Sequence, residues 1–163
     1  MQRRQFLLGF AAFGLGASAL ALRGGGAARA ETFPFTLSDA DWKSRLTSDQ
    51  YAVLRQEATE RPYSSPLNNV KTSGLFHCAG CDNALYSSAT KFDSGTGWPS
   101  FWAPVAGAIG NRTDYVLVYP RTEVHCARCG GHLGHVFDDG PPPTGKRHCI
   151  NGVAMQFKPG PVT

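Results

Sequence analysis

The spacing of apolar residues changes near Thr72 and divides the chain into two regions. Before that point the pattern is helical. Ser38, followed by Asp41 three residues later, is typical of a helix N-cap with an acidic first turn. We therefore expect a short helix over Asp39–Leu46, after an extended segment that leads in from Thr32.

A second helix start follows at Thr47, where Gln50 occupies the position of a capping box. Apolar residues then recur at helical spacing until Pro62, and this spacing predicts a helix over Tyr51–Thr59. The next segment, 61–71, contains several prolines and asparagines and has no periodicity, so we expect an irregular connection there.

After Thr72, short apolar segments bounded by turn residues predict strands. The predicted strands are Gly74–Phe76, Ala84–Tyr86, Ser100–Trp102, Tyr115–Tyr119, His135–Phe137 and His148–Phe157. In the last strand, alternation places Cys149 and Asn151 on one face and Ile150 and Gly152 on the other. Short strands after two helices predict a mainly β fold of two packed antiparallel sheets, with short helices at the N-terminal side.

The first thirty residues have the pattern of a leader rather than of a folded segment. Arg3-Arg4 precedes an apolar run that reaches Leu22, and Ala28-Arg29-Ala30 has the small-x-small pattern of a cleavage site. We expect residues 1–30 to be a cleaved twin-arginine export signal. Residues 31–163 would then be a single domain in the periplasm or another exported location. The alternative is a retained membrane anchor, but three glycines interrupt the run.

Removing this leader also removes the excess of positive charge. The full chain carries sixteen Lys and Arg residues against twelve Asp and Glu residues. Four of the basic residues and none of the acidic residues lie in the first thirty positions, so twelve of each remain. A balanced domain has no general attraction for nucleic acid or for an anionic membrane, and we expect neither as a stable partner.

Four of the five cysteines occur as two C-x-x-C pairs next to predicted turns. The pairs are Cys78 with Cys81 and Cys126 with Cys129. A two-residue spacer lets both thiolates of a pair reach one tetrahedral ion, and four thiolates leave no open position for a catalytic water. We therefore expect a structural zinc ion. Two disulfides are the alternative in an exported protein, although export of an already folded domain favours zinc.

Cys149 is the fifth cysteine and has no cysteine near it in the sequence. It is either a small buried side chain or a reactive thiol. Arg147 and His148 precede it and are expected to raise the local positive potential, which favours a thiolate, and Asn151 can orient a partner by hydrogen bonding. This environment indicates a reactive thiol.

Two further clusters carry side chains that can act on a substrate. His132 and His135 follow directly on the second C-x-x-C pair, where histidines serve either as acid–base groups or as supporting groups of a metal site. The segment Gly95–Trp102 holds two tryptophans and a phenylalanine beside a glycine-rich turn. These aromatics belong either to the core or to the wall of an apolar pocket that Trp98 would line.

Taken together, these motifs resemble a known family. In order, they are C-x-x-C, G-x-G-W-P-S-F, C-x-x-C-G-G-H-L-G-H-V-F-x-D-G-P and T-G-x-R-x-C-I-N. They are similar to those of the peptide methionine-(R)-S-oxide reductases, the B-type methionine sulfoxide reductases, over residues 36–157. The resemblance implies a fold of two antiparallel sheets with a four-cysteine zinc site. It also implies reduction of the R epimer of methionine sulfoxide in proteins or peptides, and of the free amino acid as a further substrate.

The resemblance implies roles for individual residues as well. Cys149 matches the nucleophile that attacks the sulfoxide sulfur and becomes a sulfenic acid. His135, as the principal group, and His132 match the histidines that assist proton transfer. The remaining matched positions are Trp98 in the wall of the methyl pocket, Phe137 and Arg147 in the substrate site, and Asn151 beside the catalytic groups.

Thr96 departs from the pattern of the family, because many members carry a recycling cysteine at this position. With the other cysteines assigned to zinc, no internal thiol remains to reduce a sulfenic acid on Cys149. We therefore expect an external thioredoxin-like protein or a small thiol to do so. The other expected partners are oxidised proteins and the twin-arginine export machinery, and we expect the protein to be a monomer.

Two other functions fit parts of the pattern. A zinc-ribbon-like binding or chaperone module would use the aromatic residues as a groove and Cys149 only for packing. A periplasmic thiol-disulfide oxidoreductase would instead use the C-x-x-C pairs for exchange and would hold no zinc.

Overall fold

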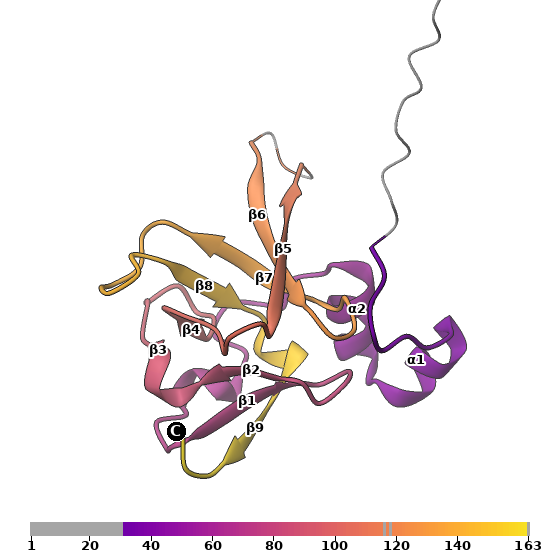
Figure 1. The fold of residues 1–163 in the computed structure, drawn as a ribbon, viewed down its shortest axis with the longest axis horizontal. Coiled ribbons are helices and arrows are strands. Elements are labelled where there is room, and N and C mark those ends of the chain that lie inside the picture. The colour runs from indigo at the N-terminus through magenta and orange to yellow at the C-terminus, as the bar shows by residue number, and fades with distance from the viewer. Residues whose placement is uncertain (1–30, 116, 118, 163) are drawn as a thin grey trace, which may run out of the picture. The chain divides into compact units, whose positions relative to one another are not determined.

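The computed structural model describes residues 31–162 except positions 116 and 118. The export signal expected at residues 1–30 lies outside the described residues. Along the described chain, two helices, α1 (Asp39–Arg45) and α2 (Ser48–Gln56), come first and strands follow (Figure 1). Within this part of the chain, no helix has both the length and the apolar character needed to cross a membrane.

Both helices are capped by the residues that the sequence predicts. The Ser38 hydroxyl accepts a hydrogen bond from the Asp41 N–H at 3.2 Å. Thr47 and Gln50 form the reciprocal capping box, with the hydroxyl accepting from the Gln50 N–H at 3.2 Å and the Gln50 side chain accepting from the Thr47 N–H at 3.1 Å. Local side-chain chemistry therefore sets both helix starts.

The predicted bounds of the second helix, Tyr51–Thr59, are wrong at both ends. The helix starts at Ser48, directly after its cap, because the residues between the cap and Tyr51 form its first turn. It ends at Gln56, because Glu57 adopts a left-handed conformation with a φ of 59°. The apolar residues keep their helical spacing after Gln56, so this spacing alone places the end of the helix too late.

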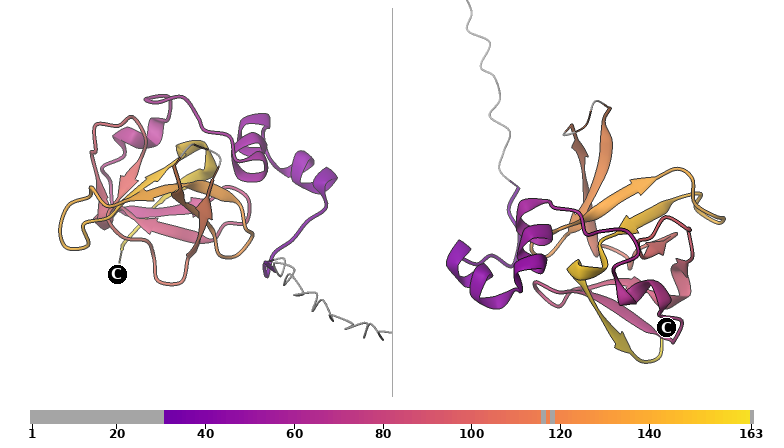
Figure 2. Two further views of the ribbon diagram at one scale, coloured as in Figure 1. Left: turned by 90° about the horizontal axis from the view of Figure 1, so that it is seen from above. Right: turned by 180° about the vertical axis from the view of Figure 1, so that it is seen from behind.

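After the helices, the strands of the described chain form two antiparallel sheets, which confirms the predicted fold class (Figures 1 and 2). The strands are β1 (Gly74–Cys78), β2 (Ala84–Ser87), β3 (Lys91–Phe92), β4 (Ser100–Phe101), β5 (Ile109–Asp114), β6 (Arg121–Cys126), β7 (His132–Phe137), β8 (Arg147–Ile150) and β9 (Met155–Pro159). The smaller sheet has the order β2-β1-β9, and the larger has the order β3-β4-β8-β7-β6-β5.

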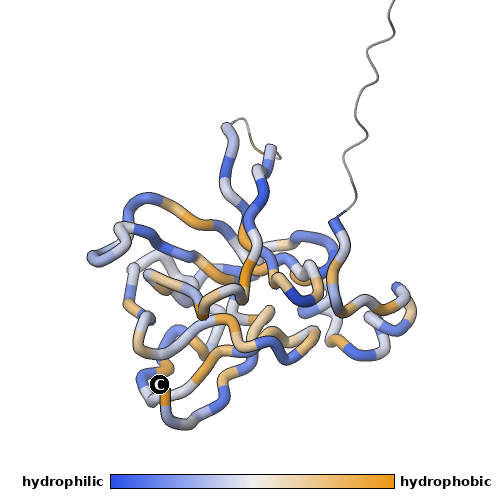
Figure 3. Tube along the Cα trace, in the orientation of Figure 1, coloured by the Kyte–Doolittle hydropathy of each residue, from blue (hydrophilic) through white to orange (hydrophobic). Residues whose placement is uncertain are grey.

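The prediction of a strand over Tyr115–Tyr119 is wrong. The described residues of this segment lie in the loop between β5 and β6, and Tyr115 is 75% exposed. The strands on either side of the loop are β5 and β6, and their halves next to the loop carry polar residues, which Figure 3 shows as hydrophilic. The sequence of these halves therefore has no alternation of apolar and polar residues. These strands are specified by cross-strand pairing, with Asp114 opposite Arg121.

The predicted final strand, His148–Phe157, is also wrong, because it is two strands. β8 ends at Ile150, and the 3-10 helix Gly152–Ala154 turns the chain before β9 begins at Met155. β8 belongs to the larger sheet and β9 to the smaller one, so this short helix carries the chain between the sheets.

Aromatic side chains fill the space between the two sheets. Tyr86 on β2 stacks on Phe101 on β4 with ring centroids 4.4 Å apart, and Phe76 on β1 meets Phe101 edge to face at 4.9 Å. All three are fully buried. Burial of such large rings is the main favourable contribution to packing the sheets together.

Strand β8 lies inside the larger sheet, between β4 and β7. Cys149 on β8 lies opposite Ser100 on β4 and opposite His135 on β7. Gly134 allows β7 to approach, because a Cβ atom there would lie 2.1 Å from the Cys149 carbonyl oxygen. Backbone pairing alone therefore brings the predicted nucleophile and the predicted acid–base residue together.

Candidate active site and metal centre

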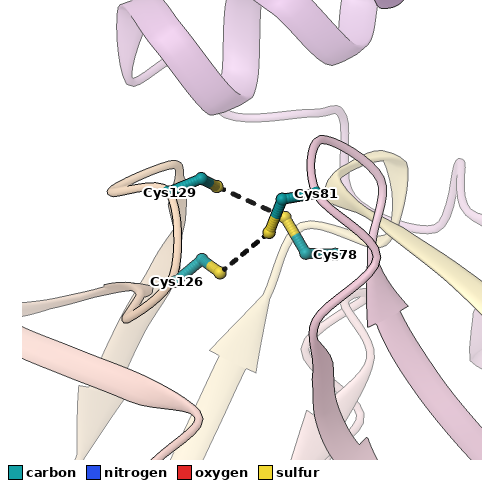
Figure 4. Close-up of side chains that lie close together, drawn as sticks. All are labelled: Cys78, Cys81, Cys126 and Cys129. Atoms are coloured by element: carbon teal, nitrogen blue, oxygen red, sulfur yellow. Dashed lines mark hydrogen bonds between the residues drawn. The ribbon is translucent and has the colours of Figure 1, made fainter. Parts of the chain in front are cut away.

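The four paired cysteines converge from two turns that belong to different sheets (Figure 4). Cys78 ends β1 and Cys81 lies on the turn that leads to β2, while Cys126 ends β6 and Cys129 lies on the turn that leads to β7. All four are buried, and their sulfur atoms lie within 4.8 Å of one another.

The distances fit one ion and not two disulfides. The Cys78 and Cys129 sulfurs are 3.7 Å apart, and the Cys81 and Cys126 sulfurs are 3.6 Å apart. A tetrahedron with zinc–sulfur bonds of about 2.3 Å has sulfur–sulfur edges of about 3.8 Å. All four are free cysteines, and the closest contacts run between the turns rather than within each C-x-x-C pair. These residues form the structural zinc site, and four thiolates leave no position open for a substrate.

The burial of these four sulfurs also bears on their charge. Four buried sulfurs cannot all ionise without a cation between them, and a divalent ion supplies the required charge.

The N-terminal helices cover this metal centre and bind its turns. Arg45 of α1 donates to the Gly80 carbonyl at 2.7 Å, and Arg55 of α2 donates to the Cys129 carbonyl at 3.1 Å. Leu54 packs so closely that a Cβ atom at Gly131 would lie 2.9 Å from its side chain. The short helices therefore depend on the metal turns for their position.

Cys149 lies on the wall of a small cavity of about 130 Å³. The lining residues are partly aromatic and partly polar, and they come from the connection after α2, from the loop before β4, from β6, β7 and β8, and from the residue that follows β8. They are Thr59, Trp98, Arg121, Gly134, His135, Phe137, Cys149 and Asn151. Five of the predicted site residues, namely Trp98, His135, Phe137, Cys149 and Asn151, thus share one cavity, and Cys149 and Asn151 open on the same side, as their spacing predicts.

Burial controls the ionisation of Cys149. It raises the pKa of the thiol above its ordinary value, while the contact with Thr96 and the positive charge of Arg147 oppose this rise without cancelling it. Arg147 therefore favours the thiolate, as expected from the sequence, but burial outweighs its effect. The expectation that His148 also favours the thiolate is wrong. An apolar, half-buried site disfavours the charged form of a thiol.

His148 contributes no positive charge, because it lies on the other face of β8. Its Nδ1 lies 3.2 Å from the hydroxyl of Tyr86, between the sheets. Burial and the charge of Lys146 lower its pKa to about 4, so the ring is neutral at pH 7. His148 is a core residue.

Arg147 lies beside the cavity in a fixed orientation. Its guanidinium donates two hydrogen bonds to the Asp139 carboxylate, at 2.8 and 2.9 Å, and lies 4.5 Å from the centre of the Phe137 ring. The ion pair raises the pKa of Arg147, so it stays charged. Two parallel hydrogen bonds and a stacked ring hold a guanidinium plane in one place.

His135 is supported from the neighbouring strands. Its Nε2 lies 2.7 Å from an Asp114 carboxylate oxygen, and Arg121 donates to the same oxygen at 2.5 Å. Burial lowers the pKa of His135, and the hydrogen bond to Asp114 only partly offsets this effect. The ring is thus mostly neutral at pH 7, with the Nε2 proton directed to the carboxylate.

His132 lies behind His135 and does not line the cavity of Cys149. The two rings are 5.5 Å apart, and His132 Nδ1 lies 2.7 Å from a Glu123 carboxylate oxygen. Burial would raise the pKa of Glu123, but hydrogen bonds with His125 and His132 lower it well below its ordinary range. His132 therefore packs against His135 and does not contact the cavity directly.

Glu60 joins three parts of the site, and it belongs to no motif that would single it out in the sequence. Its carboxylate accepts from the N–H groups of Gly152 and Val153 at 2.6 and 2.9 Å. Its own N–H donates to the Asn151 side chain at 3.0 Å, and its carbonyl accepts from the Trp98 indole at 3.1 Å. Asn151 also donates to the backbone of β7, so it holds the end of β8 in place.

The fold and the site together define a zinc-stabilised β domain with a half-buried thiol in an aromatic-walled cavity. The family model of the SelR domain matches residues 46–159. A peptide methionine sulfoxide reductase MsrB from Agrobacterium fabrum is 55% identical over 123 residues, which are 75% of this chain and 91% of that protein. The enzyme of the same name from Methanosarcina barkeri is 52% identical over 122 residues, 74% of this chain and 86% of that protein.

A third relative, MsrB from Pseudomonas syringae pv. syringae, is 52% identical over 120 residues, which are 73% of this chain and 92% of that protein. The chain belongs to the SelR-domain family of peptide methionine sulfoxide reductases, which confirms the resemblance drawn from its motifs.

The metal centre leads to a direct prediction. Replacing either Cys126 or Cys129 by serine should release the metal and unfold the domain. Binding at a structural zinc site is worth on the order of 10 kcal/mol, which is comparable to the whole stability of a domain. Metal content and thermal unfolding measure both effects, with Cys149→Ser as the control that keeps one zinc per chain. A Cys129→Ser protein with no metal and an unchanged thermal midpoint would contradict the structural role.

Proposed function

We propose that this protein reduces the R epimer of methionine sulfoxide in oxidised proteins and peptides, and also the free amino acid. The position of the Cys149 thiol carries the proposal. It lies half-buried in a small cavity with two aromatic walls, opposite a neutral histidine, in a chain of the methionine sulfoxide reductase family.

The cavity explains a preference for one epimer. The sulfoxide sulfur carries a methyl group, the rest of the methionine, an oxygen and a lone pair. Trp98 and Phe137 offer an apolar surface for the methyl group, and Arg121 offers polar hydrogens for the oxygen. With these two groups placed, only one hand of the sulfur presents itself to Cys149 while the peptide points outwards.

The reaction transfers one oxygen atom from the substrate to the protein. The Cys149 sulfur attacks the sulfoxide sulfur, the sulfoxide oxygen takes up the thiol proton, and the oxygen ends on Cys149 as a sulfenic acid while the thioether leaves. His135 mediates the proton transfer. With its Nε2 proton directed to Asp114, its Nδ1 is the nitrogen that takes the proton from the thiol and returns it to the oxygen.

Regeneration requires thiols from outside the chain. Thr96 occupies the position of the recycling cysteine, and the other four thiols hold the metal. An external thiol attacks the Cys149 sulfenic acid, which forms a mixed disulfide and releases water. A second thiol then frees Cys149 and leaves as part of a disulfide. A thioredoxin-like protein or a small thiol supplies both equivalents.

We also propose that the protein works outside the cytoplasm as a monomer, after export by the twin-arginine route. Arg3-Arg4, the apolar run and Ala28-Arg29-Ala30 support this proposal. Replacing both arginines by lysine should move most of the protein from the periplasmic to the cytoplasmic fraction. The exported wild-type chain should begin at Glu31 on N-terminal sequencing. Equal export of the lysine variant would contradict the route.

Separated epimers of a blocked methionine sulfoxide test the activity. The wild-type protein should reduce the R epimer with a thiol reductant and leave the S epimer unchanged. Cys149→Ser should lower the rate by at least about three orders of magnitude, because a hydroxyl is a far weaker nucleophile at neutral pH. The variant should keep its zinc and its thermal midpoint. Reduction of the S epimer, or near wild-type activity of Cys149→Ser, would contradict the proposal.

A single turnover without reductant tests the regeneration step. After reaction with the R epimer, mass spectrometry of the thiol-blocked protein should show one oxygen on Cys149 or its dimedone adduct, with zinc retained. No disulfide between Cys149 and another cysteine should form, because using a zinc ligand would release the metal. A stoichiometric disulfide from Cys149 to Cys126 or Cys129 would show internal recycling instead.

A further inference from the structure

Three hydroxyl groups form a continuous chain that ends at the sulfur of Cys149. The Thr96 hydroxyl lies 3.8 Å from the Cys149 sulfur and 2.8 Å from the Ser94 hydroxyl. The Ser94 hydroxyl lies 2.7 Å from the Ser100 hydroxyl, which donates to the Trp98 carbonyl at 3.2 Å. The contact to Cys149 is within hydrogen-bond range for a sulfur atom.

The hydroxyl chain formed by Thr96, Ser94 and Ser100 is held in place by the surrounding structure. Ser100 is fully buried on β4, directly opposite Cys149 in the sheet. The loop that carries Thr96 is held at Gly95, whose N–H donates to Asp93 at 2.9 Å and whose carbonyl accepts from the Tyr63 hydroxyl at 2.6 Å. The hydroxyl of Thr96 is thus placed by its surroundings and not by chance rotation of an exposed side chain.

A hydroxyl group suits the changing chemistry of this sulfur. As a thiol, Cys149 donates a hydrogen bond, and as a thiolate it only accepts. Thr96 can accept in the first state and donate in the second, because its hydroxyl hydrogen rotates. Ser94 can compensate by turning its hydrogen from Ser100 to Thr96, and Ser100 can then turn its own hydrogen from the Trp98 carbonyl to Ser94, because each hydroxyl supplies only one hydrogen. The chain can therefore follow the sulfur without moving any heavy atom.

We propose that Thr96 is a catalytic residue whose hydroxyl, oriented by Ser94 and Ser100 as positioning residues, stabilises the Cys149 thiolate and holds the sulfenic acid for the external thiol. This proposal rests on the reductase activity proposed above. Thr96, at the position of the usual recycling cysteine, thus makes a hydrogen bond to Cys149 where that cysteine would form a disulfide with it.

The second role concerns the step that consumes the sulfenic acid. The external thiol forms a sulfur–sulfur bond to Cys149, the sulfur–oxygen bond breaks, and the oxygen leaves with its own hydrogen and the proton of the incoming thiol as water. Thr96 donates to the departing oxygen, and Ser94 donates to Thr96. The hydroxyl chain thereby stabilises the negative charge that develops on the departing oxygen. Both hydrogens of the water come from the sulfenic acid and the incoming thiol, so the hydroxyl groups keep their own.

Other charged or titratable groups face the same sulfur and bear on its ionisation. They are His135 on β7, Arg121 on β6, Arg147 on β8 itself, and Asp139 on the connection between β7 and β8. Arg147 favours the thiolate and Asp139 opposes it, and the two are paired with each other. None of these groups changes in a substitution at Thr96, so its effect on Cys149 can be isolated.

The pH dependence of Cys149 alkylation by iodoacetamide tests the hydroxyl chain without any sulfoxide. In the zinc-loaded protein, Thr96→Val should raise the midpoint by about one pH unit, so that alkylation at pH 8 slows about tenfold. Thr96→Ser should restore the wild-type profile. Ser94→Ala should give a smaller shift and add nothing to Thr96→Val, because Ser94 acts through Thr96.

Kinetics with the R epimer and dithiothreitol provide the second measurement. Thr96→Val should lower kcat about tenfold and leave KM nearly unchanged, since the hydroxyl acts on charge that develops at the sulfur. Thr122→Val, at an exposed threonine on β6, is the matched control and should match the wild type in both measurements. Zinc content and the thermal midpoint show that each variant is folded.

The outcomes separate this proposal from the proposed activity. If Thr96→Val titrates like the wild type, or if Thr96→Ser fails to restore the profile, the hydroxyl chain has no such role, even when the protein reduces sulfoxide. If the alkylation shift occurs but the wild-type protein reduces neither epimer, the hydroxyl chain is upheld for the thiol and the reductase activity is wrong.

Discussion

One tetrathiolate metal centre fixes how the two sheets meet. Its ligands come in pairs from the β1–β2 turn of the smaller sheet and from the β6–β7 turn of the larger sheet. β7 begins at His132, only three residues after the last ligand, so the metal also fixes the start of the strand that carries His135. Both helices donate hydrogen bonds to the same turns. A small domain without disulfides thus obtains from zinc the rigidity that its active site requires.

Features with a local cause could be predicted from the sequence. The caps at Ser38 and Thr47 and the two C-x-x-C turns depend on residues at most three apart, and all of them occur as expected. The end of α2 could not be predicted, because it depends on the left-handed conformation of Glu57. The paired strands β5 and β6 escaped prediction because register, and not apolar alternation, defines their outer halves.

The same distinction applies to the site. Cys149, His135 and Trp98 belong to recognisable motifs, and the structure brings them to one cavity. Asp114 and Glu60 belong to no motif, since each acts across a strand or a loop that only folding brings near. The error about His148 has a different origin. Positive charge next to a cysteine in sequence says little, because neighbouring residues on a strand face opposite sides of the sheet.

Because of Gly134, the placement of Cys149 and His135 depends on different parts of the chain from those that form the walls of the cavity. Because no side chain fits between it and the Cys149 carbonyl, the backbones of β7 and β8 hold His135 and Cys149 opposite each other regardless of the residues around them. The aromatic walls come from elsewhere, with Trp98 on a loop and Phe137 at the end of its strand. Changes in these walls can therefore alter which oxidised sequences are accepted, while Cys149 and His135 stay opposite each other.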